Sequence, residues 1–584
     1  MLKLPFSLSD TAASLLIALS LVVHAALINA LGVNVPSSDE WAFVSFAAAV
    51  AGGGDWLPLV FAHHNEHRYV TLRLLLAANV WLLGWDSFVM MYASLAVAAF
   101  TLFGLWLMTR QLVGSCVWSF VPIACLAGGL MQYQNMLWGL QLAFYFVTAC
   151  AVWTCLLLTY HSRRAFAGAC ACAAWGTFSA AGGVLIWPIG VVVLLGGGGG
   201  WRRKALWLTL AVAAVAGYSW GYSPRGGKFV QLDYILADLG SYVHFGLMIL
   251  GAPLGAGSQA VALATGLGVV IGLVICAAQL VRRRDQLSRA HWAPIGLALF
   301  GLAIAGLITI GRAHQGLYIA LESRYVTLVL PAAVALLILL RWLCKQPGVG
   351  RSLYVSGCAL VAVGVVGGAV AGLDGAQAWA EMNRRTAFLV HTSVLWSDDE
   401  LDLNRPKLRH ISPLRHRIVA LEEHRLSLFR APLDTWRLVR WQDGVALGEV
   451  LPGREVAQTF ICPVATLRDV SVPFATYQRR NAGTLSLRLF DEQSDALLAA
   501  RTLASADVRD NAFVIVQLSE PLSGCEGRRL RLEITAPDAV SGAALTVWGF
   551  QAFLGGELRQ GGELVPGREL GIELNTQVSV RRRV

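Results

Sequence analysis

Charge is scarce in this sequence: of its 584 residues, 14% are charged and 56% are hydrophobic. A chain this long and this apolar is not one soluble domain, and its composition is typical of a polytopic membrane protein. The glycine run Gly196–Gly200 is not followed by the Lys-Ser/Thr pair of a phosphate-binding loop, so no nucleotide site is indicated. The net charge of +10 comes without a nucleic-acid-binding motif, and we expect no nucleic-acid partner.

Long apolar runs are confined to residues 1–372, and the sequence is rich in charge from Asp374 onward. A membrane-spanning helix needs roughly 20 apolar residues, which predicts about eleven spans. Residues 12–31 have some features of a signal peptide, but the run is long and lacks a clean cleavage site, which favours an uncleaved first span. The predicted spans are residues 12–32, 88–109, 116–131, 137–160, 165–178, 184–198, 205–222, 258–280, 291–311, 326–343 and 352–372.

Basic residues divide the breaks between these spans into two sets. The richer set predicts the cytoplasmic face, and it holds Lys3, Arg110, Arg163, Arg164, Arg202, Arg203, Lys204, Arg282, Arg283, Arg284, Arg289, Lys345 and Arg351. The other set, within the first 372 residues, holds Arg68, Arg73, Arg225, Lys228, Arg312 and Arg324. An odd number of spans then places the N-terminus inside and the C-terminal part outside.

One further apolar segment, Tyr69–Trp85, is long enough to be confused with a span. If it crossed the membrane, every later break would change sides and the arginine-rich breaks would lie outside, against the charge rule. We therefore expect a juxtamembrane helix at the outer interface, where Arg73, Trp81 and Trp85 suit the lipid headgroup region.

The polar part is predicted to contain a mostly helical linker over residues 373–447 and a β-sandwich over residues 448–584. Short alternating segments separated by Gly, Pro, Asn and Asp, such as "GTLSLRLFD" and "RRLRLEITA", indicate the sandwich. An aromatic and polar set could form a sugar-binding face, although ordinary strand composition explains it as well: Tyr477, Arg479, Arg480, Asn481 and Trp548.

Cysteine usage gives one expectation and excludes another. Of the 11 cysteines, Cys462 and Cys525 are the pair that lies in the polar part, and they lack the CxxC or Cys/His spacing of a zinc site. Because this part is expected to face an oxidising compartment, we predict a disulfide between the two.

Unusual polar residues gather on the predicted outer face, where such groups are costly unless they have a function. The carboxylates Asp39 and Glu40 follow the first span. The other candidates are His63, Glu66, His67 and Arg68 of "HHNEHR", Gln134, Asn135, Trp138 and Gln141 of "QNMLWGLQ", Arg225, Lys228 and Asp233 of "SPRGGKFVQLD", and Arg312, His314, Glu322, Arg324 and Tyr325 near the last outer break.

Each piece also has a simpler interpretation. A helical "HHNEHR" would place His63, Glu66 and His67 on one face, a set that can bind a divalent metal, but such loops more often hydrogen-bond or meet headgroups. Asp39 and Glu40 could cap a helix. Arginines flanking a span should prefer the cytoplasmic side, so Arg312 and Arg324 are better interpreted as ligands of an anion.

The pieces "DEW", "NEHR", "NMLWGLQ" and "SRY", the long first outer loop and the final β-sandwich together resemble the GT-C superfamily of membrane glycosyltransferases. The resemblance implies a multi-pass protein of the bacterial inner membrane with a periplasmic C-terminal domain similar to carbohydrate-binding modules. It implies Asp39 as the catalytic base with Glu40 as the second candidate, a polyprenyl-phosphate-linked sugar as donor, and donor-phosphate binding by Arg312, Arg324, Arg68 and His314.

The sequence therefore predicts a glycosyltransferase that moves a sugar, with inversion, from a polyprenyl phosphate to a periplasmic glycan, lipid or protein. The acceptor would be bound by the selected residues of the first loop and of "QNMLWGLQ", together with Tyr325. No cofactor is certain, and a divalent metal is a secondary alternative. An O-antigen ligase-like or polymerase-like transferase is one rival. A lipid-linked glycan flippase is another, but it should show charge at the membrane midplane and internal repeats.

The topology is testable with reporter fusions. A phosphatase fused after Gly375 should be active, because the odd span count and the charge rule place that residue outside. A reporter that works only in the cytoplasm should stay dark at the same position. Bright cytoplasmic signal there would contradict the topology and the outer site together.

Overall fold

The structure is a computed structural model, and it describes residues 8–222, 232–346, 350–391, 393, 414–430, 435–437, 444–464, 466–551 and 556–575. The candidate residues Arg225 and Lys228 lie outside the described residues, as does the side chain of Asp233. The chain forms two compact units, one of residues Met1–Ala387 with Val419–Leu428 and one of residues Phe388–Ile418 with Phe429–Val584.

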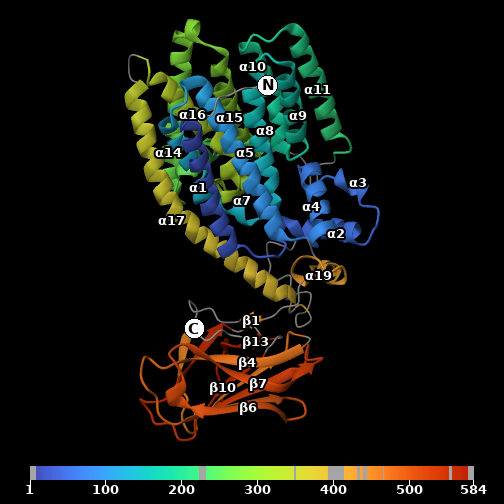
Figure 1. The fold of residues 1–584 in the computed structure, drawn as a ribbon, viewed down its shortest axis with the longest axis vertical. Coiled ribbons are helices and arrows are strands. Elements are labelled where there is room, and N and C mark those ends of the chain that lie inside the picture. The colour runs from blue at the N-terminus through green and yellow to red at the C-terminus, as the bar shows by residue number, and fades with distance from the viewer. Residues whose placement is uncertain are drawn as a thin grey trace. The chain divides into compact units, whose positions relative to one another are not determined.

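The first unit is a bundle of helices (Figure 1). Its apolar segments are helical because their polar backbone groups must be paired internally where no water reaches them. The helices are α1 Leu8–Leu31, α2 Val44–Ala51, α3 Leu57–Val60, α4 Val70–Leu83, α5 Ser87–Val113, α6 Val121–Ala127, α7 Tyr133–Leu137, α8 Leu142–Leu158, α9 Arg163–Thr177, α10 Ile186–Gly196, α11 Trp201–Ser219, α12 Leu232–Ala237, α13 Leu239–Gly251, α14 Gln259–Arg282, α15 Trp292–Arg312, α16 Ser323–Leu343, α17 Gly350–His391 and α19 Leu414–Glu423.

Seven helical segments of the described chain are long and apolar enough to cross a membrane. They correspond to α1, α5, α8, α14, α15, α16 and α17, with the short 3₁₀ turns that flank α8 and α15. Of the other predicted spans, residues 165–178, 184–198 and 205–222 form α9, α10 and α11. The chain is therefore a polytopic α-helical membrane protein with a C-terminal β domain.

Two segments differ from the predicted pattern. Residues 116–131 form short pieces rather than one span, because Pro122 starts α6 and Gly128 and Gly129 end it. Helix α13 was not predicted, and it packs against α14 through very close backbone contact: a Cβ on Gly266 would lie 1.8 Å from the Leu247 carbonyl oxygen. The glycine spacing that permits this contact looks like ordinary apolar sequence.

The segment Tyr69–Trp85 forms α4, which has 14 residues and ends at Gly84 in the left-handed conformation. A helix of this length is about 21 Å long, shorter than the hydrocarbon layer. Trp81 and Leu82 on α4 are exposed, whereas Arg73 is buried and its guanidinium donates to the carbonyl oxygens of Val60 and Ala62. These features agree with a helix that packs over the first loop instead of crossing the membrane.

Contacts between helix ends collect basic residues at one end of the bundle. Arg110 at the end of α5 pairs with Asp10 of α1 at 2.9 Å. Lys345, after α16, donates to the Val113 carbonyl oxygen at 2.7 Å. Arg283, after α14, lies 3.4 Å from the Gln346 side chain. The opposite ends of α15 and α16 carry Arg312 and Arg324.

The second unit contains two antiparallel sheets (Figure 1). One has the order β1-β13-β4-β9-β12, with β2 beside β9 and β7 beside β4, and the other has the order β11-β10-β3-β8-β5-β6. The strands are β1 Thr435–Arg437, β2 Val445–Glu449, β3 Val456–Ile461, β4 Thr466–Ala475, β5 Thr484–Asp491, β6 Ala496–Ala504, β7 Ala512–Ser523, β8 Arg529–Thr535, β9 Thr546–Gln551, β10 Leu558–Gln560, β11 Glu563–Leu564, β12 Arg568–Leu570 and β13 Glu573–Asn575.

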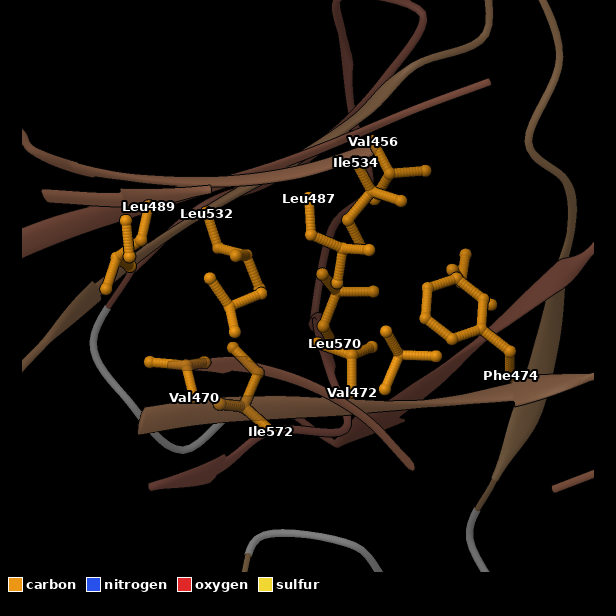
Figure 2. Close-up of a cluster of buried hydrophobic side chains, with 14 of the residues drawn as sticks. Val456, Val470, Val472, Phe474, Leu487, Leu489, Leu532, Ile534, Leu570 and Ile572 are labelled. Atoms are coloured by element: carbon orange, nitrogen blue, oxygen red, sulfur yellow. The ribbon is translucent and has the colours of Figure 1, made fainter. Parts of the chain in front are cut away.

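The core of this unit lies between the two sheets (Figure 2). Leu487, Leu489 and Leu532 of one sheet face Val470 and Val472 of the other, and all five side chains are fully buried. Alternate residues of β3, β5 and β8 are buried, which is the two-residue period of a sheet with one buried face. The sandwich is therefore built on the alternation seen in the sequence.

The residues of the predicted sugar-binding face are not equally accessible. Tyr477 is exposed, and the Arg479 guanidinium lies 5.4 Å from its ring centre. Trp548 donates its indole N–H to Asn511 at 3.1 Å. Asn481 is buried, so it cannot belong to an exposed face. Carbohydrate binding by this unit stays a prediction.

The structure joins Cys462, just after β3, to Cys525, between β7 and β8, with the Cα atoms 5.8 Å apart. Their sequence separation of 63 residues implies a stabilisation of about 4 kcal/mol in the chain-entropy model. We expect non-reducing peptide mapping of the purified full-length protein to recover a linked Cys462–Cys525 peptide. Alkylation of both Cys462 and Cys525 in the folded, unreduced protein would contradict the bond.

Candidate active site

A cavity of about 190 Å³ lies within the helical unit, near the ends of α15 and α16 that carry Arg312 and Arg324. Its polar wall comes from four separate segments: the first loop, the turn before α8, the turn before α10 and the α15–α16 connection. The residues that line it are Asp39, His64, Asn65, Glu66, His67, Tyr69, Trp138, Leu140, Gln141, Phe144, Val147, Ala180, Ala181, Gly182, Ile304, Leu307, Ile308, Gly311, Arg312, Arg324, Tyr325 and Leu328.

The two adjacent carboxylates after α1 have different surroundings. Both lie on the 3₁₀ helix Ser38–Phe43, and Asp39 lines the cavity. Glu40 is buried, and its two oxygens accept the backbone N–H groups of Ser37 at 2.8 Å and Leu140 at 2.9 Å. Glu40 therefore ties the first loop to the turn before α8, and Asp39 is the carboxylate of the pair that is placed for chemistry.

"HHNEHR" is a turn in the structure, so the helical face considered from the sequence does not form. The backbone N–H groups of His64 and His67 donate to each other's carbonyl oxygens at 2.8 and 2.9 Å, with Asn65 at a φ of +51°. Asparagine adopts this left-handed conformation more readily than most residues. Within the described residues no group of three His, Cys, Asp or Glu side chains is placed to hold a metal ion.

The turn aims Glu66 and His67 at the cavity. Glu66 pairs with Arg312, Oε1 to Nη2, at 2.5 Å, and the same oxygen lies 3.7 Å from His67 Nε2. Burial opposes ionisation of Glu66, but its coupling to His67 and the positive charge of Arg312 together hold the pKa of Glu66 below its ordinary value. Burial lowers the pKa of His67 to about 4, so His67 is neutral at pH 7.

The α15–α16 connection brings the two arginines into one cavity. Arg324 is in the first turn of α16, where it pairs with Glu322 at 2.5 Å and lies 5.0 Å from the Tyr325 ring centre. Its backbone is held from the turn before α8: Gln134 accepts the Arg324 N–H at 3.0 Å, and Asn135 donates to the Arg324 carbonyl at 3.1 Å. Gln134 and Asn135 thus position an arginine instead of lining the cavity.

Some of the lining side chains have a buried polar atom that makes no hydrogen bond to the described residues. Among them are Trp138, through its indole nitrogen, and Gln141, through its amide oxygen, and both of these side chains are almost fully buried. An unpaired buried donor or acceptor costs about 1–3 kcal/mol. A hydroxylated or anionic ligand in the cavity would remove that cost, which suits the predicted role of these residues.

Three predicted site residues lie away from the cavity. His63 contacts the Arg68 guanidinium at 3.1 Å and the Tyr218 carbonyl at 3.3 Å, and Arg68 also donates to the Trp220 carbonyl. This group fastens the first loop to the end of α11. His314 is exposed on the 3₁₀ helix Ala313–Gln315. The structure gives none of the three a position from which it lines the cavity.

Tyr69 belongs to the site although the sequence analysis did not select it. It lines the cavity with its ring centre 4.9 Å from that of His67. Tyr69 stands next to the selected "HHNEHR", so this proximity was the available signal. Glu322, one of the polar residues selected at the last outer break, neutralises Arg324.

The apolar helices and the polar cavity define an integral membrane protein with a mixed-charge site. No family model matches the chain, and no curated protein matches it. Among solved structures, it is similar to the crystal structure of ArnT from Cupriavidus metallidurans bound to undecaprenyl phosphate. The identity is 13% and the TM-score 0.42, over 71% of this chain and 88% of that one. A similarity this low carries no functional inference.

Glu40 offers a test of its structural role. Burial raises the pKa of Glu40 from 4.5 to about 7, so its contribution to stability is present below about pH 4.5 and is lost as the pH rises through about 7. Glu40→Gln should remove this pH dependence. It should also lower stability by about 1–3 kcal/mol, because an amide nitrogen would face one of the two N–H donors.

Thermal unfolding of the purified protein across this pH range measures both effects. Unchanged pH dependence in Glu40→Gln would show that another group is responsible.

Proposed function

We propose that the protein is a GT-C-like glycosyltransferase that transfers a sugar from a polyprenyl-phosphate donor to a hydroxyl acceptor outside the cytoplasm. The observation that carries the proposal is the convergence of Asp39, Arg312 and Arg324 on one cavity from positions far apart in the sequence. These are the charges that such a transfer requires at one place: a base for the acceptor and cations for the departing phosphate.

The proposed reaction is a single displacement. Asp39 accepts the proton of the acceptor hydroxyl while the acceptor oxygen bonds to the anomeric carbon of the donor sugar. The bond between that carbon and the phosphate oxygen breaks, and its electron pair leaves with the polyprenyl phosphate. Arg312 and Arg324 stabilise the negative charge that develops on the phosphate. One displacement inverts the anomeric configuration.

The shape of the cavity supports a lipid-linked donor. Its apolar wall includes Ile304, Leu307 and Ile308 of α15 and Leu328 of α16, next to Arg312 and Arg324. A phosphate on an isoprenoid chain needs cations beside an apolar path at the membrane surface. The helices that supply both belong to the segments long and apolar enough to span a membrane.

The charges of the cavity favour a monophosphate donor over a diphosphate donor. Asp39 and Glu66 line the cavity and Glu322 pairs with Arg324, so three carboxylates already accompany the two guanidinium groups. A sugar phosphodiester adds one negative charge, whereas a diphosphate adds two and would meet greater repulsion. The ligase-like or polymerase-like transferase, which would use a lipid diphosphate, is therefore the second candidate. A flippase is less well supported, because the arginines of the cavity lie at the ends of α15 and α16 and not midway along these helices.

The test of the proposal is Asp39→Asn, which keeps the shape of the side chain and removes the base. We expect the variant to insert and to bind undecaprenyl phosphate, but to transfer labelled sugar at roughly one hundredth of the wild-type rate or less. Transfer from a polyprenyl-phosphate sugar by purified protein in lipid nanodiscs is the measurement.

Asp55→Asn is the matched control, because Asp55 is an exposed acid of the same loop and lies outside the cavity wall. It should retain wild-type transfer. Near-wild-type transfer by Asp39→Asn would eliminate Asp39 as the base, and no transfer by the wild-type protein from any polyprenyl-phosphate sugar would overturn the proposed function.

A further inference from the structure

The ion pair between Glu66 and Arg312 competes with donor binding in the proposed reaction. The inference from this competition rests on the proposed function. Arg312 would bind the donor phosphate, yet its Nη2 already contacts Glu66 Oε1 at 2.5 Å inside the cavity. Both side chains are partly buried, with exposed fractions of 31% and 25%, so water screens the pair incompletely. A phosphate that approaches Arg312 must displace the carboxylate.

A displaced Glu66 needs another partner. If it stayed in the cavity beside Asp39 and the phosphate, these three anions and Glu322, which pairs with Arg324, would share two cations. Repulsion among unpaired anions at short range would oppose donor binding. Moving Glu66 away from the phosphate but onto a hydrogen-bond donor would remove the conflict.

His67 is that donor. Its Nδ1 accepts the Ala181 N–H at 3.1 Å, which leaves the proton of the neutral ring on Nε2. Nε2 lies 3.7 Å from the Glu66 oxygen that contacts Arg312, slightly beyond hydrogen-bond distance. A small rotation of the Glu66 side chain would close this gap.

The backbone around Glu66 is fixed, which confines the movement to the side chain. The Tyr218 hydroxyl donates to the Glu66 carbonyl at 2.6 Å, and the paired N–H groups of His64 and His67 close the turn on both sides. The Glu66 carboxylate can therefore contact either Arg312 or His67 while the backbone of the turn stays in place.

We infer that Glu66 is an internal occupant of the donor-phosphate site: its carboxylate holds Arg312 in the free protein and passes to His67 Nε2 when a lipid phosphate binds Arg312. The carboxylate keeps the guanidinium neutralised and oriented before the donor arrives. It also sets the donor affinity, because every binding event must break the Glu66–Arg312 pair.

The experiment is a titration of the full-length protein in nanodiscs with undecaprenyl phosphate, followed by native mass spectrometry. Glu66→Gln should bind this lipid about tenfold more tightly than wild type, because the competing charge is gone and a tenfold change corresponds to about 1.4 kcal/mol. A role for Glu66 as a direct phosphate or acceptor ligand predicts weaker binding or no change. Asp55→Asn, which removes the same charge from the same loop, should bind like wild type.

Two double variants test the exchange itself. In an Arg312→Gln background, Glu66→Gln should no longer tighten binding, because the pair that it breaks is already absent. His67→Gln alone should weaken lipid binding several-fold, and it should have little effect in the Glu66→Gln background. Loss of binding by His67→Gln in both backgrounds would assign His67 a different role and overturn the exchange.

Glu66→Asp provides a second variant in case the glutamine variant does not fold. The shorter side chain keeps the charge but withdraws it from Arg312, so it should also bind the lipid more tightly than wild type. If wild type binds the lipid and neither Glu66 variant binds it more tightly, the inference is wrong while the proposed function stands. If neither wild type nor the Glu66 variants bind the lipid, and wild type transfers no sugar, both are wrong.

Discussion

The cost of burying charge in an apolar bundle governs the arrangement of the cavity. An arginine at the end of a membrane-type helix is expensive unless a counter-charge accompanies it. Arg312 meets this requirement through Glu66 of the first loop, and Arg324 meets it through Glu322 next to it in the chain. The first loop is thus held to α15 by an ion pair, and the same pair gives the cavity its mixed charge.

The segments that carry the charged groups are fixed by hydrogen bonds to the backbone. Glu40 receives N–H groups from two segments that are about a hundred residues apart, and Gln134 and Asn135 bracket the backbone of Arg324. These residues look like candidate ligands in the sequence because they are polar and lie close to the site. In the structure they orient other residues, which is the more common use of a buried amide or carboxylate.

The sequence identified the charged residues of the site, but it did not reveal the backbone turn that positions them. Asp39, Glu66 and Arg312 could be selected because charge is rare in apolar sequence, and each lines the cavity. The turn at His64–His67 could not be foreseen, because it depends on one left-handed residue, Asn65. Strand β6, Ala496–Ala504, is also hard to recognise in the sequence, because it lies at a sheet edge and lacks the alternation of its neighbours.

Charge serves different purposes at the two ends of the bundle. Away from the cavity, Arg110 pairs with Asp10 and Lys345 donates to a backbone carbonyl, so these cations join helix ends. The Asp10 oxygen that holds Arg110 also accepts the indole N–H of Trp106 at 3.1 Å, so both of its partners are bound at once. At the cavity, the Glu66 oxygen contacts Arg312 at 2.5 Å but lies 3.7 Å from His67 Nε2, so its second partner is within reach and not yet bound. A carboxylate that only joined helices would bind both partners together, as Asp10 does, whereas a site that must admit an anion benefits from a second partner that is still unbound.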